Sequence, residues 1–264
     1  MAWFTRSSRF IILVTILAVA LMLGFVTHVS GQVQAPSSSA SLSSKVENAF
    51  RPPRGTSSPV NTASGGTRQG KDEELGRCIE SNRPVVALVP DSGIGETAAE
   101  YPTVFWYMPQ TAARALEFVL RDENVNDLYR VKYLLPKSTK GVVSTPGIMS
   151  LAVPSLASLS PLKTGHEYYW QLALICNPTN RLKDIIVEGW IKRVDPDQTL
   201  ALRVQQATPQ ERVALYAGDR LWYETLTSLV ELRRDRPDDK DVAEAWKTLL
   251  DSVGLEAISS EWVK

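Results

Sequence analysis

Short segments between about residue 83 and residue 195 alternate hydrophobic and polar positions. Around position 131, for example, Tyr129, Val131 and Tyr133 alternate with Arg130 and Lys132. A period of two, with β-branched and aromatic residues inside and with Pro, Gly, Asn or Asp at the ends, predicts strands. The predicted strands are Val85–Val89, Thr103–Tyr107, Ala115–Arg121, Leu128–Leu135, Ile148–Val153, Glu167–Cys176 and Ile185–Val194. The alanines at positions 112, 113 and 115 leave a helix over Thr111–Leu120 as the alternative to the third strand.

The spacing of apolar positions changes to a helical period after Asp195. Asp195 and Thr208 each precede a proline and have Gln or Glu three positions later, which is typical of a capping box with Pro at the first helical position. Gly254 suits a left-handed helix end, after which Leu255 can pack back on Leu250. These signals predict helices over 196–206, 209–217, 220–233 and 239–253.

The order of these elements indicates the fold class. Seven closely spaced strands leave no room for helical crossovers, so they predict an immunoglobulin-like antiparallel β-sandwich over residues 71–195. Each later helix is apolar on one side only and needs a surface to cover. We therefore expect a mainly β protein of the α+β class, in which a helical subdomain, residues 196–264, packs on the sandwich.

The first 31 residues have the layout of an export signal. Arg6 and Arg9 are the only charged residues before Lys45, and an apolar run of 17 residues extends from Phe10 to Val26. A basic start followed by an apolar stretch and small residues, here ending at Gly31, is typical of a secretory signal peptide. The run also reaches the lower limit of a membrane span, so an uncleaved signal anchor is the alternative. We expect an exported protein in the periplasm, at the cell surface or outside the cell, with membrane contact only through this segment if it is retained.

Residues 32–70 are rich in Ser, Pro and Gly, and Phe50 is their only aromatic residue. Such a composition cannot bury enough apolar surface to offset its conformational entropy. The segment is therefore predicted to be a disordered linker that holds the folded part away from a membrane or wall.

Composition and charge exclude several classes of function. Basic and acidic residues number 29 each, so the formal net charge is zero and no nucleic-acid partner is expected. Two histidines and two cysteines form no spacing typical of a metal site, and no motif predicts a cofactor. The segment 90–97 contains two glycines, but it lacks the lysine and the following helix of a phosphate-binding loop. We interpret it as a loop between strands.

No set of residues in the sequence identifies a reaction. His166 would be the single histidine of a processed chain, and no G-x-S-x-G motif accompanies it, so no catalytic residue is predicted. A cell-wall glycoside hydrolase that uses two carboxylates remains an alternative, because such an enzyme needs only a suitably separated pair. The glutamates in or beside the predicted strands are Glu96, Glu100, Glu117, Glu167 and Glu188.

An ordered series of short motifs resembles one protein family. The motifs are Ala87-Leu88-Val89-Pro90, Tyr101-Pro102-Thr103, Phe105-Trp106-Tyr107-Met108-Pro109, Leu116-Glu117-Phe118-Val119-Leu120, Ile175-Cys176-Asn177-Pro178, Val187-Glu188-Gly189-Trp190-Ile191 and Trp222-Tyr223-Glu224-Thr225-Leu226. From about residue 78 to 257 the chain is similar to a cyanobacterial exported family known as domain of unknown function 928. The resemblance implies an exported cyanobacterial protein with no assigned activity, and it implies no catalytic residue.

Cys78 and Cys176 are the only two cysteines. In an exported protein, two cysteines and no more favour one disulfide bond between them. Two buried free thiols in a sheet are the alternative.

Consecutive aromatic residues in a strand must place rings on both of its faces. One face fills the core, and the other either receives the helices, which we favour, or lies open as a stacking platform for sugar or peptide. Trp106, Tyr169 and Trp190 are the candidates for ligand-facing rings. The sequence thus favours a non-enzymatic binding or adaptor module of the cell envelope, with another envelope or secretion protein as its partner. A carbohydrate-binding module that uses the aromatic rings is the alternative.

Overall fold

The computed structural model describes residues 40–51, 78–79, 81–135 and 146–261. The strands are β1 (Val86–Ala87), β2 (Ile94–Thr97), β3 (Thr103–Met108), β4 (Ala115–Asp122), β5 (Asp127–Leu134), β6 (Gly147–Ala152), β7 (Glu167–Ile175) and β8 (Ile185–Arg193). The helices are α2 (Leu42–Phe50), α3 (Gln198–Gln206), α4 (Pro209–Gly218), α5 (Trp222–Asp235) and α6 (Lys240–Asp251), with short 3-10 helices η3 (Arg181–Lys183) and η4 (Glu256–Ile258). The predicted leader, residues 1–31, and most of the predicted linker lie outside the described residues.

The described strands form two sheets in a mixed α/β chain. One sheet has the order β1-β3-β6, and the other has the order β2-β8-β7-β4-β5. Every neighbouring pair is antiparallel except β2 and β8, which run parallel, so the prediction of an entirely antiparallel arrangement is wrong at β2. The chain leaves β1 through a turn in which Gly93 has φ +76°, a value that residues with a Cβ rarely adopt. This turn moves the chain from one sheet to the edge of the other, and the strand β2 that follows it was predicted as a loop.

The third predicted strand is a strand, and the helical alternative over 111–120 is wrong. β4 lies between β5 and β7 and pairs with both. Its side chains Leu116, Phe118 and Leu120 are buried on one face. Pairing with both neighbours satisfies the backbone hydrogen bonds on both sides of β4, and the alternation buries one of its faces. Together these contributions outweigh the helical preference of the preceding alanines.

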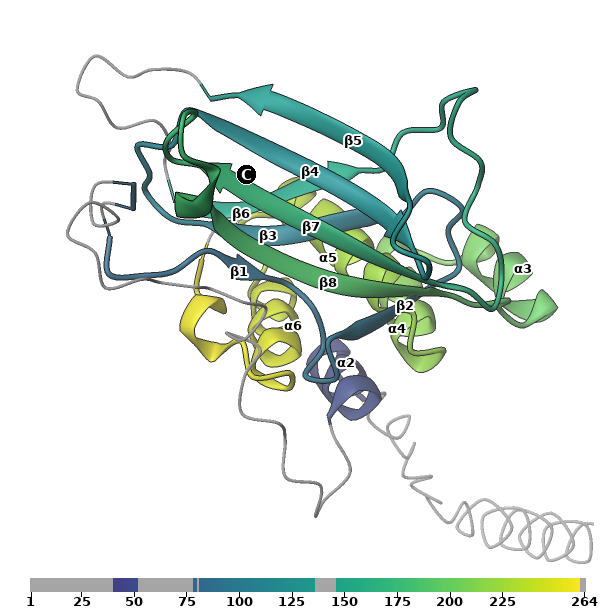
Figure 1. The fold of residues 1–264 in the computed structure, drawn as a ribbon. Coiled ribbons are helices and arrows are strands. Elements are labelled where there is room, and N and C mark those ends of the chain that lie inside the picture. Colours follow the sequence, from purple (N-terminus) through teal and green to yellow (C-terminus); the bar gives the residue numbers. More distant parts are fainter. Residues whose placement is uncertain (1–39, 52–77, 80, 136–145, 262–264) are drawn as a thin grey trace, which may run out of the picture. The chain divides into compact units, whose positions relative to one another are not determined.

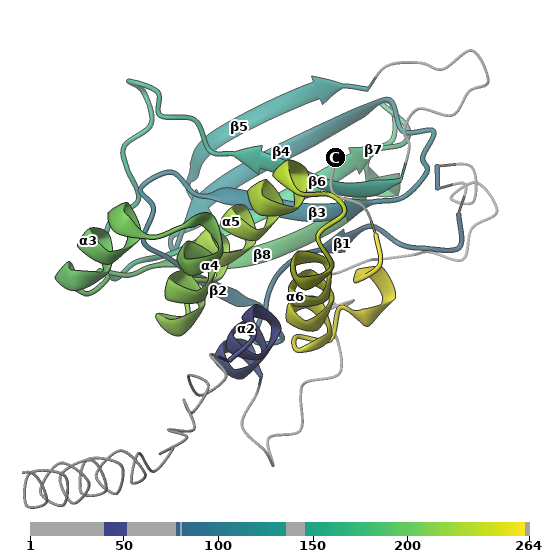
Figure 2. The same ribbon diagram turned by 180° about the vertical axis from the view of Figure 1, so that it is seen from behind.

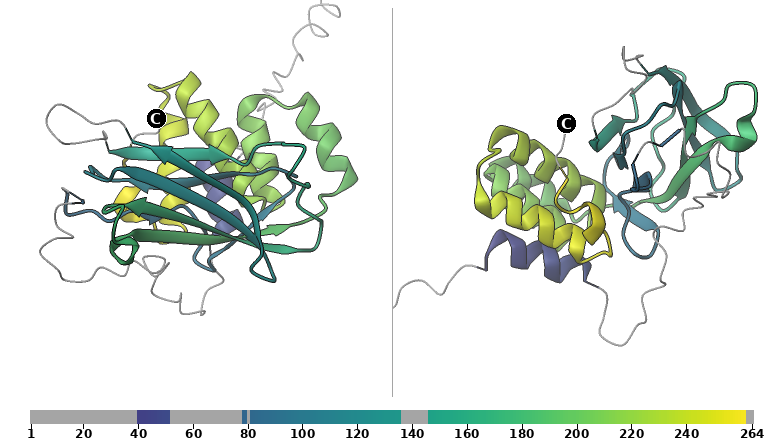
Figure 3. Two further views of the ribbon diagram at one scale, coloured as in Figure 1. Left: turned by 45° about the horizontal axis from the view of Figure 1, so that its top comes forward. Right: turned by 90° about the vertical axis from the view of Figure 1, so that its left-hand side faces the viewer.

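The helices lie on the side of the three-stranded sheet, and the five-stranded sheet is farther from them (Figure 1, and from behind in Figure 2). Figure 3 shows this order of layers from the side. α5 contacts β3 and β2, and β3 is buried continuously from Val104 to Met108. Such continuous burial means that both faces of this strand are covered. One hydrophobic core runs through both sheets and the helices.

Local capping signals explain most of the helix starts. The capping box at Thr208 is confirmed, because the Thr208 hydroxyl accepts from the Glu211 N–H and the Glu211 carboxylate accepts from the Thr208 N–H at 2.8 Å. The prediction that Asp195 caps the preceding helix is wrong. Asp197 caps α3 instead, because its carboxylate accepts from both the N–H and the hydroxyl of Thr199. At the end of α6, Gly254 has φ +76° and the Leu255 N–H donates to the Leu250 carbonyl, as predicted.

Helix α2 corrects the prediction of disorder over the whole of residues 32–70. Val46 and Phe50 are buried, and α2 contacts α4 and α6. The Phe50 ring meets the Trp222 ring edge-on, with centroids 5.1 Å apart. The serine-rich composition obscured a short amphipathic pattern, in which apolar residues recur at positions 42, 46, 49 and 50 behind the capping residue Ser41.

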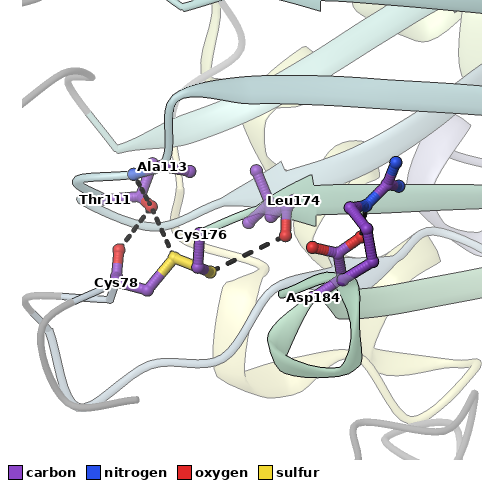
Figure 4. The surroundings of a disulfide bond; sticks show 7 residues. Cys78, Thr111, Ala113, Leu174, Cys176 and Asp184 are labelled. Carbon is purple, nitrogen blue, oxygen red and sulfur yellow. Dashed lines mark hydrogen bonds and ion pairs between the residues drawn. A yellow bond between two sulfur atoms is a disulfide. The ribbon is translucent and has the colours of Figure 1, made fainter. Parts of the chain in front are cut away.

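Cys78 and Cys176 form a disulfide bond, which confirms this pairing (Figure 4). The bond joins the segment before β1 to the residue after β7 across a sequence separation of 98. The Thr111 hydroxyl and the Ala112 N–H both donate to the Cys78 carbonyl, which holds the same segment beside the start of β4. No helix within the described residues is long and apolar enough to cross a membrane.

Candidate functional site

The outer face of the five-stranded sheet, which is turned away from the helices, is the candidate site (Figure 3). Cross-strand partners lie on the same face, so the register defines which side chains share it. Tyr169 is opposite Trp190 and Arg121, and Gln171 is opposite Glu188. The outer-face side chains of β4, β5, β7 and β8 are Ala115, Glu117, Val119, Arg121, Asp127, Arg130, Lys132, Leu134, Glu167, Tyr169, Gln171, Ala173, Ile175, Ile186, Glu188, Trp190 and Lys192. This face therefore combines aromatic rings with charged groups.

Two aromatic rings form the centre of the outer face. The Tyr169 and Trp190 rings have centroids 5.2 Å apart and planes inclined at 57°, and Trp190 is 38% exposed. The Arg121 guanidinium lies 6.0 Å from the centre of the Tyr169 ring. The Tyr169 hydroxyl donates to the Glu188 carboxylate. Burial, together with this hydrogen bond, raises the pKa of Tyr169, so its phenol stays protonated and remains a donor.

The backbone of Trp190 is held from beneath by α5. The Tyr223 hydroxyl donates to the Trp190 carbonyl at 3.0 Å and accepts from the Trp170 indole N–H at 3.2 Å. A Cβ at Gly189 would come within 2.8 Å of that indole nitrogen. Glycine at this position thus allows Trp170 and Tyr223 to pack directly under the strand. The exposed ring is carried on a rigid support.

Ion pairs extend across the outer face toward β5 and η3. The Glu117 carboxylate accepts from Arg181 at 2.9 Å and lies 3.2 Å from Arg130. The hydrogen bond from Arg181 lowers the pKa of Glu117. Arg181 also binds Asp184 at 2.5 Å, although burial of Asp184 raises the pKa of that carboxyl group. The Arg130 and Arg181 side chains are each 46% exposed, whereas the Glu117 side chain is 16% exposed and that of Asp184 only 3% exposed, so the network holds η3 against β4 through two largely buried carboxylates.

The structure brings together two of the three predicted ligand-facing rings. Tyr169 and Trp190 are cross-strand partners on the outer face. Trp106 is buried at 2% exposure, so the prediction of an accessible ring is wrong there. Its strand, β3, lies between the other sheet and the helices, where the rings on both faces are covered. His166 lies at an exposed turn and contacts Glu123 at 3.3 Å, away from the outer-face aromatic pair.

The roles of Tyr223 and Glu224 are not evident from the sequence, in which both residues are part of the motif Trp222–Leu226. Glu224 is a largely buried carboxylate, and this burial raises its pKa. Its Oε1 atom accepts from the Thr97 hydroxyl at 2.6 Å and from the Ala98 and Ala99 N–H groups at 2.9 Å each. These bonds hold the end of β2 against α5. An acidic residue in the first turn of a helix without a side-chain cap was the available signal.

Glu224 also borders a cleft of about 430 Å³ between the segment 99–103 and the helices α4 and α5. Tyr101, Arg212 and Tyr216 lie along its walls. Because its Oε1 atom already accepts three hydrogen bonds, Glu224 acts here as a structural link between layers. No group of three or more metal-ligating side chains occurs within the described part of the chain.

Comparison with known protein families identifies one match. The profile of a family described as Domain of Unknown Function (DUF928) matches residues 63–263. The chain belongs to the DUF928 family. The match includes both sheets, α3 to α6 and both cysteines of this DUF928 chain. A comparison with curated proteins found no match.

Proposed function

We propose that this DUF928 protein is a non-enzymatic binding module that recognises another protein through the outer face of its five-stranded sheet. The observation that carries the proposal is the Tyr169–Trp190 pair, in which a half-buried Tyr169 ring supports the 38% exposed Trp190 on a sheet face that the helices leave uncovered. Trp, Tyr and Arg are the residue types most enriched among side chains that dominate protein–protein binding energy, and Arg121 completes that set here.

The rigidity of this surface supports the proposal. Trp190 and Tyr169 are on neighbouring strands, and the Tyr223 hydroxyl fixes the Trp190 backbone from the core side. A preorganised aromatic anchor loses little conformational entropy when a partner binds. The ion pairs around Glu117 would then orient the partner rather than supply most of the affinity.

The carboxylates give weaker support to a glycoside hydrolase. The general acid of such an enzyme needs a raised pKa, whereas Arg181 lowers that of Glu117. Glu224 has a raised pKa, but its Oε1 atom accepts three hydrogen bonds from the end of β2. Clear bands in a peptidoglycan zymogram that disappear in Glu→Gln variants would contradict the non-enzymatic proposal.

The test compares the full chain with two variants as bait for envelope extracts. Trp190→Ala removes the central ring, whereas Leu202→Ala removes an exposed apolar side chain from α3, 63% exposed and outside the outer face. We expect capture of at least one specific protein to fall ~10-fold or more in Trp190→Ala and to stay unchanged in Leu202→Ala. Equal capture by both variants and the unaltered chain would rule out the outer face as the recognition surface.

Carbohydrate binding is the second candidate, because Trp190 presents an exposed ring beside the polar groups of Glu188 and Gln171. A sugar ring could stack on the indole while these groups form hydrogen bonds with its hydroxyls. The Tyr169 ring is inclined at 57°, so the pair suits one sugar unit better than a flat polymer surface. Saturable signals on a glycan array that Trp190→Ala abolishes would favour this candidate over a protein partner.

We further propose export to the cell envelope and an immunoglobulin-like arrangement of the sheets. The basic and apolar start of the sequence and the disulfide bond support export, because such bonds persist in oxidising compartments. The orders β1-β3-β6 and β8-β7-β4-β5 support the fold, because they correspond to strands A-B-E and G-F-C-C′ of immunoglobulin domains. The intact mass of the native protein, with and without reductant, tests leader removal and the disulfide together.

A further inference from the structure

β5 is an edge strand of eight residues, Asp127–Leu134. It pairs with β4 on one side, and no strand within the described residues pairs with its other side. Tyr133 is 43% exposed and Leu134 is 81% exposed. A long exposed edge of this kind offers unpaired backbone groups to an added strand. The other edge strand of this sheet, β2, is half as long and packs against α5.

The register shows which backbone groups are available. The Leu135 N–H donates to the Arg114 carbonyl at 3.1 Å, and Ala115 is opposite Leu134. Hydrogen-bonded and non-hydrogen-bonded pairs alternate along an antiparallel ladder. The N–H and C=O groups of residues 129, 131 and 133 therefore point toward β4, and those of residues 130, 132 and 134 point toward the free edge.

The side chains at this edge have a definite charge pattern. Arg130 and Lys132 are exposed on the outer face, whereas Tyr129, Val131 and Tyr133 alternate with them on the inner face. Arg130 is paired with Glu117 and Asp127. Lys132 lies opposite Glu117 in the register and its charge helps to lower the pKa of that carboxyl group, but no ion pair of Lys132 occurs within the described residues, and its side chain is exposed. An added strand would therefore face cations on one side and apolar groups on the other.

This pattern distinguishes between occupants. In a β5–β5 pair between two copies, Arg130 and Lys132 of one chain would lie opposite the same cations of the other, and like charges directly opposite each other are destabilising. A strand with acidic residues at alternate positions would instead place carboxylates opposite these cations. We infer that the free edge of β5 binds an extended peptide segment of alternating acidic and apolar residues by strand addition. The inference is independent of the proposed role of Trp190.

The test measures binding of two labelled probe peptides, TVEVEVT and TVKVKVT, to the full chain by fluorescence anisotropy. We expect the acidic probe to bind ~10-fold more tightly than the basic probe, with weaker binding at high salt. Hydrogen exchange should slow at the amides of residues 130, 132 and 134. Lys132→Glu should reverse the preference between the probes, and Lys132→Pro should abolish binding of both, because it removes an edge N–H group without removing a bond to β4.

Lys240→Glu is the matched control, because it makes the same charge change at an exposed position of α6, which does not pack against β5. It should leave both affinities unchanged. Absence of saturable binding of the acidic probe, protection confined to β8, or equal binding in Lys132→Pro would each overturn the inference. A dimer in sedimentation that Lys132→Pro dissociates would also overturn it, in favour of a second copy. The acidic probe should bind Trp190→Ala as it binds the unaltered chain, and loss of this binding would place the probe on the outer face and overturn the inference.

Discussion

Three consecutive residues at the start of α5 link the helices to both sheets. The Trp222 indole N–H donates to the Leu88 carbonyl at 3.0 Å, just after β1. Tyr223 binds the carbonyl of Trp190 on β8, and Glu224 accepts the N–H groups that follow β2. Each of these groups satisfies buried polar atoms that would otherwise be costly to remove from water. The triplet therefore determines where the helical layer sits.

Tyr223→Phe removes one hydroxyl and leaves two buried groups without their partner. The Trp170 indole N–H and the Trp190 carbonyl both lose a hydrogen bond. We expect a loss of about 1–3 kcal/mol in the free energy of unfolding, measured by urea denaturation. Tyr133→Phe, at an exposed position, should change it by less than about 0.5 kcal/mol. An equally small effect of Tyr223→Phe would show that water replaces the hydroxyl.

Glu224 makes stability depend on pH with a defined sign. Burial raises its folded-state pKa above the ordinary value of 4.5, so the native chain binds this proton more tightly than the unfolded chain. The contribution of this proton to the free energy of unfolding is therefore fully present below the pKa of Glu224 in the unfolded chain. It is lost as the pH rises through the pKa of Glu224 in the folded chain. Glu224→Gln keeps an acceptor oxygen but no charge, so its stability relative to the unaltered chain should be higher at pH 7 than at pH 4.

Urea denaturation at the two pH values measures this difference directly. Glu224→Ala serves as the control, because it removes the acceptor oxygen and should destabilise the chain by about 2–4 kcal/mol at pH 7. If the unaltered chain instead gains stability relative to Glu224→Gln between pH 4 and pH 7, the three donors after β2 stabilise the carboxylate more than burial destabilises it.

At the scale of elements, α2 is a part of the fold that the sequence composition concealed. Its buried residues Val46 and Phe50 contact the helical layer, and Phe50 meets Trp222, the first residue of α5. A nine-residue helix is only marginally stable in isolation, so packing against α4 and α6 must stabilise it. α2 is therefore an additional element of the helical layer.

Phe50→Ala tests whether α2 contributes to stability. Removal of a buried aromatic ring should lower the free energy of unfolding by about 3 kcal/mol, measured by urea denaturation. Asn48→Ala changes an exposed residue of the same helix and should have almost no effect. Similar stabilities of the two variants would mean that α2 does not dock in solution.

At the scale of the whole molecule, the disulfide bond joins distant parts of the chain. Cys78 lies before β1 and Cys176 follows β7, with a sequence separation of 98. Closing so long a loop mainly restricts the unfolded chain, and the chain-entropy model assigns to it about 4–5 kcal/mol. The bond also anchors the start of the sheet region at the end of the five-stranded sheet where β7 ends and β4 begins.

Reduction should therefore lower stability without abolishing the fold. We expect the midpoint of urea unfolding to fall with dithiothreitol by an amount equivalent to at most about 4–5 kcal/mol. The double variant Cys78→Ser/Cys176→Ser should match the reduced chain and should not respond to reductant. A response of that variant would mean that the reductant acts elsewhere.

The sequence alone determined most strands and several helix ends, because these depend on local physics. The alternation of hydrophobic and polar residues predicted β3 to β8 nearly at their observed bounds. The Thr208 capping box and the helix end at Gly254 could be recognised from neighbouring residues. The start of α3 was misplaced by two residues, because Asp195 and Asp197 carry similar local signals and only the contacts of Asp197 distinguish them.

The accessibility of each ring and the contacts between the layers depend on tertiary packing. Trp106 and Trp190 occupy similar strand patterns, yet helices cover the strand of the first and leave the second exposed. The parallel pairing of β2 with β8 and the bonds of Glu224 to the end of β2 join residues more than 90 positions apart, and the bonds of Tyr223 join residues 33 and 53 positions apart, so no local pattern encodes them. Contacts between distant segments depend on packing of the whole chain, and burial is a property of that packing and not of sequence period.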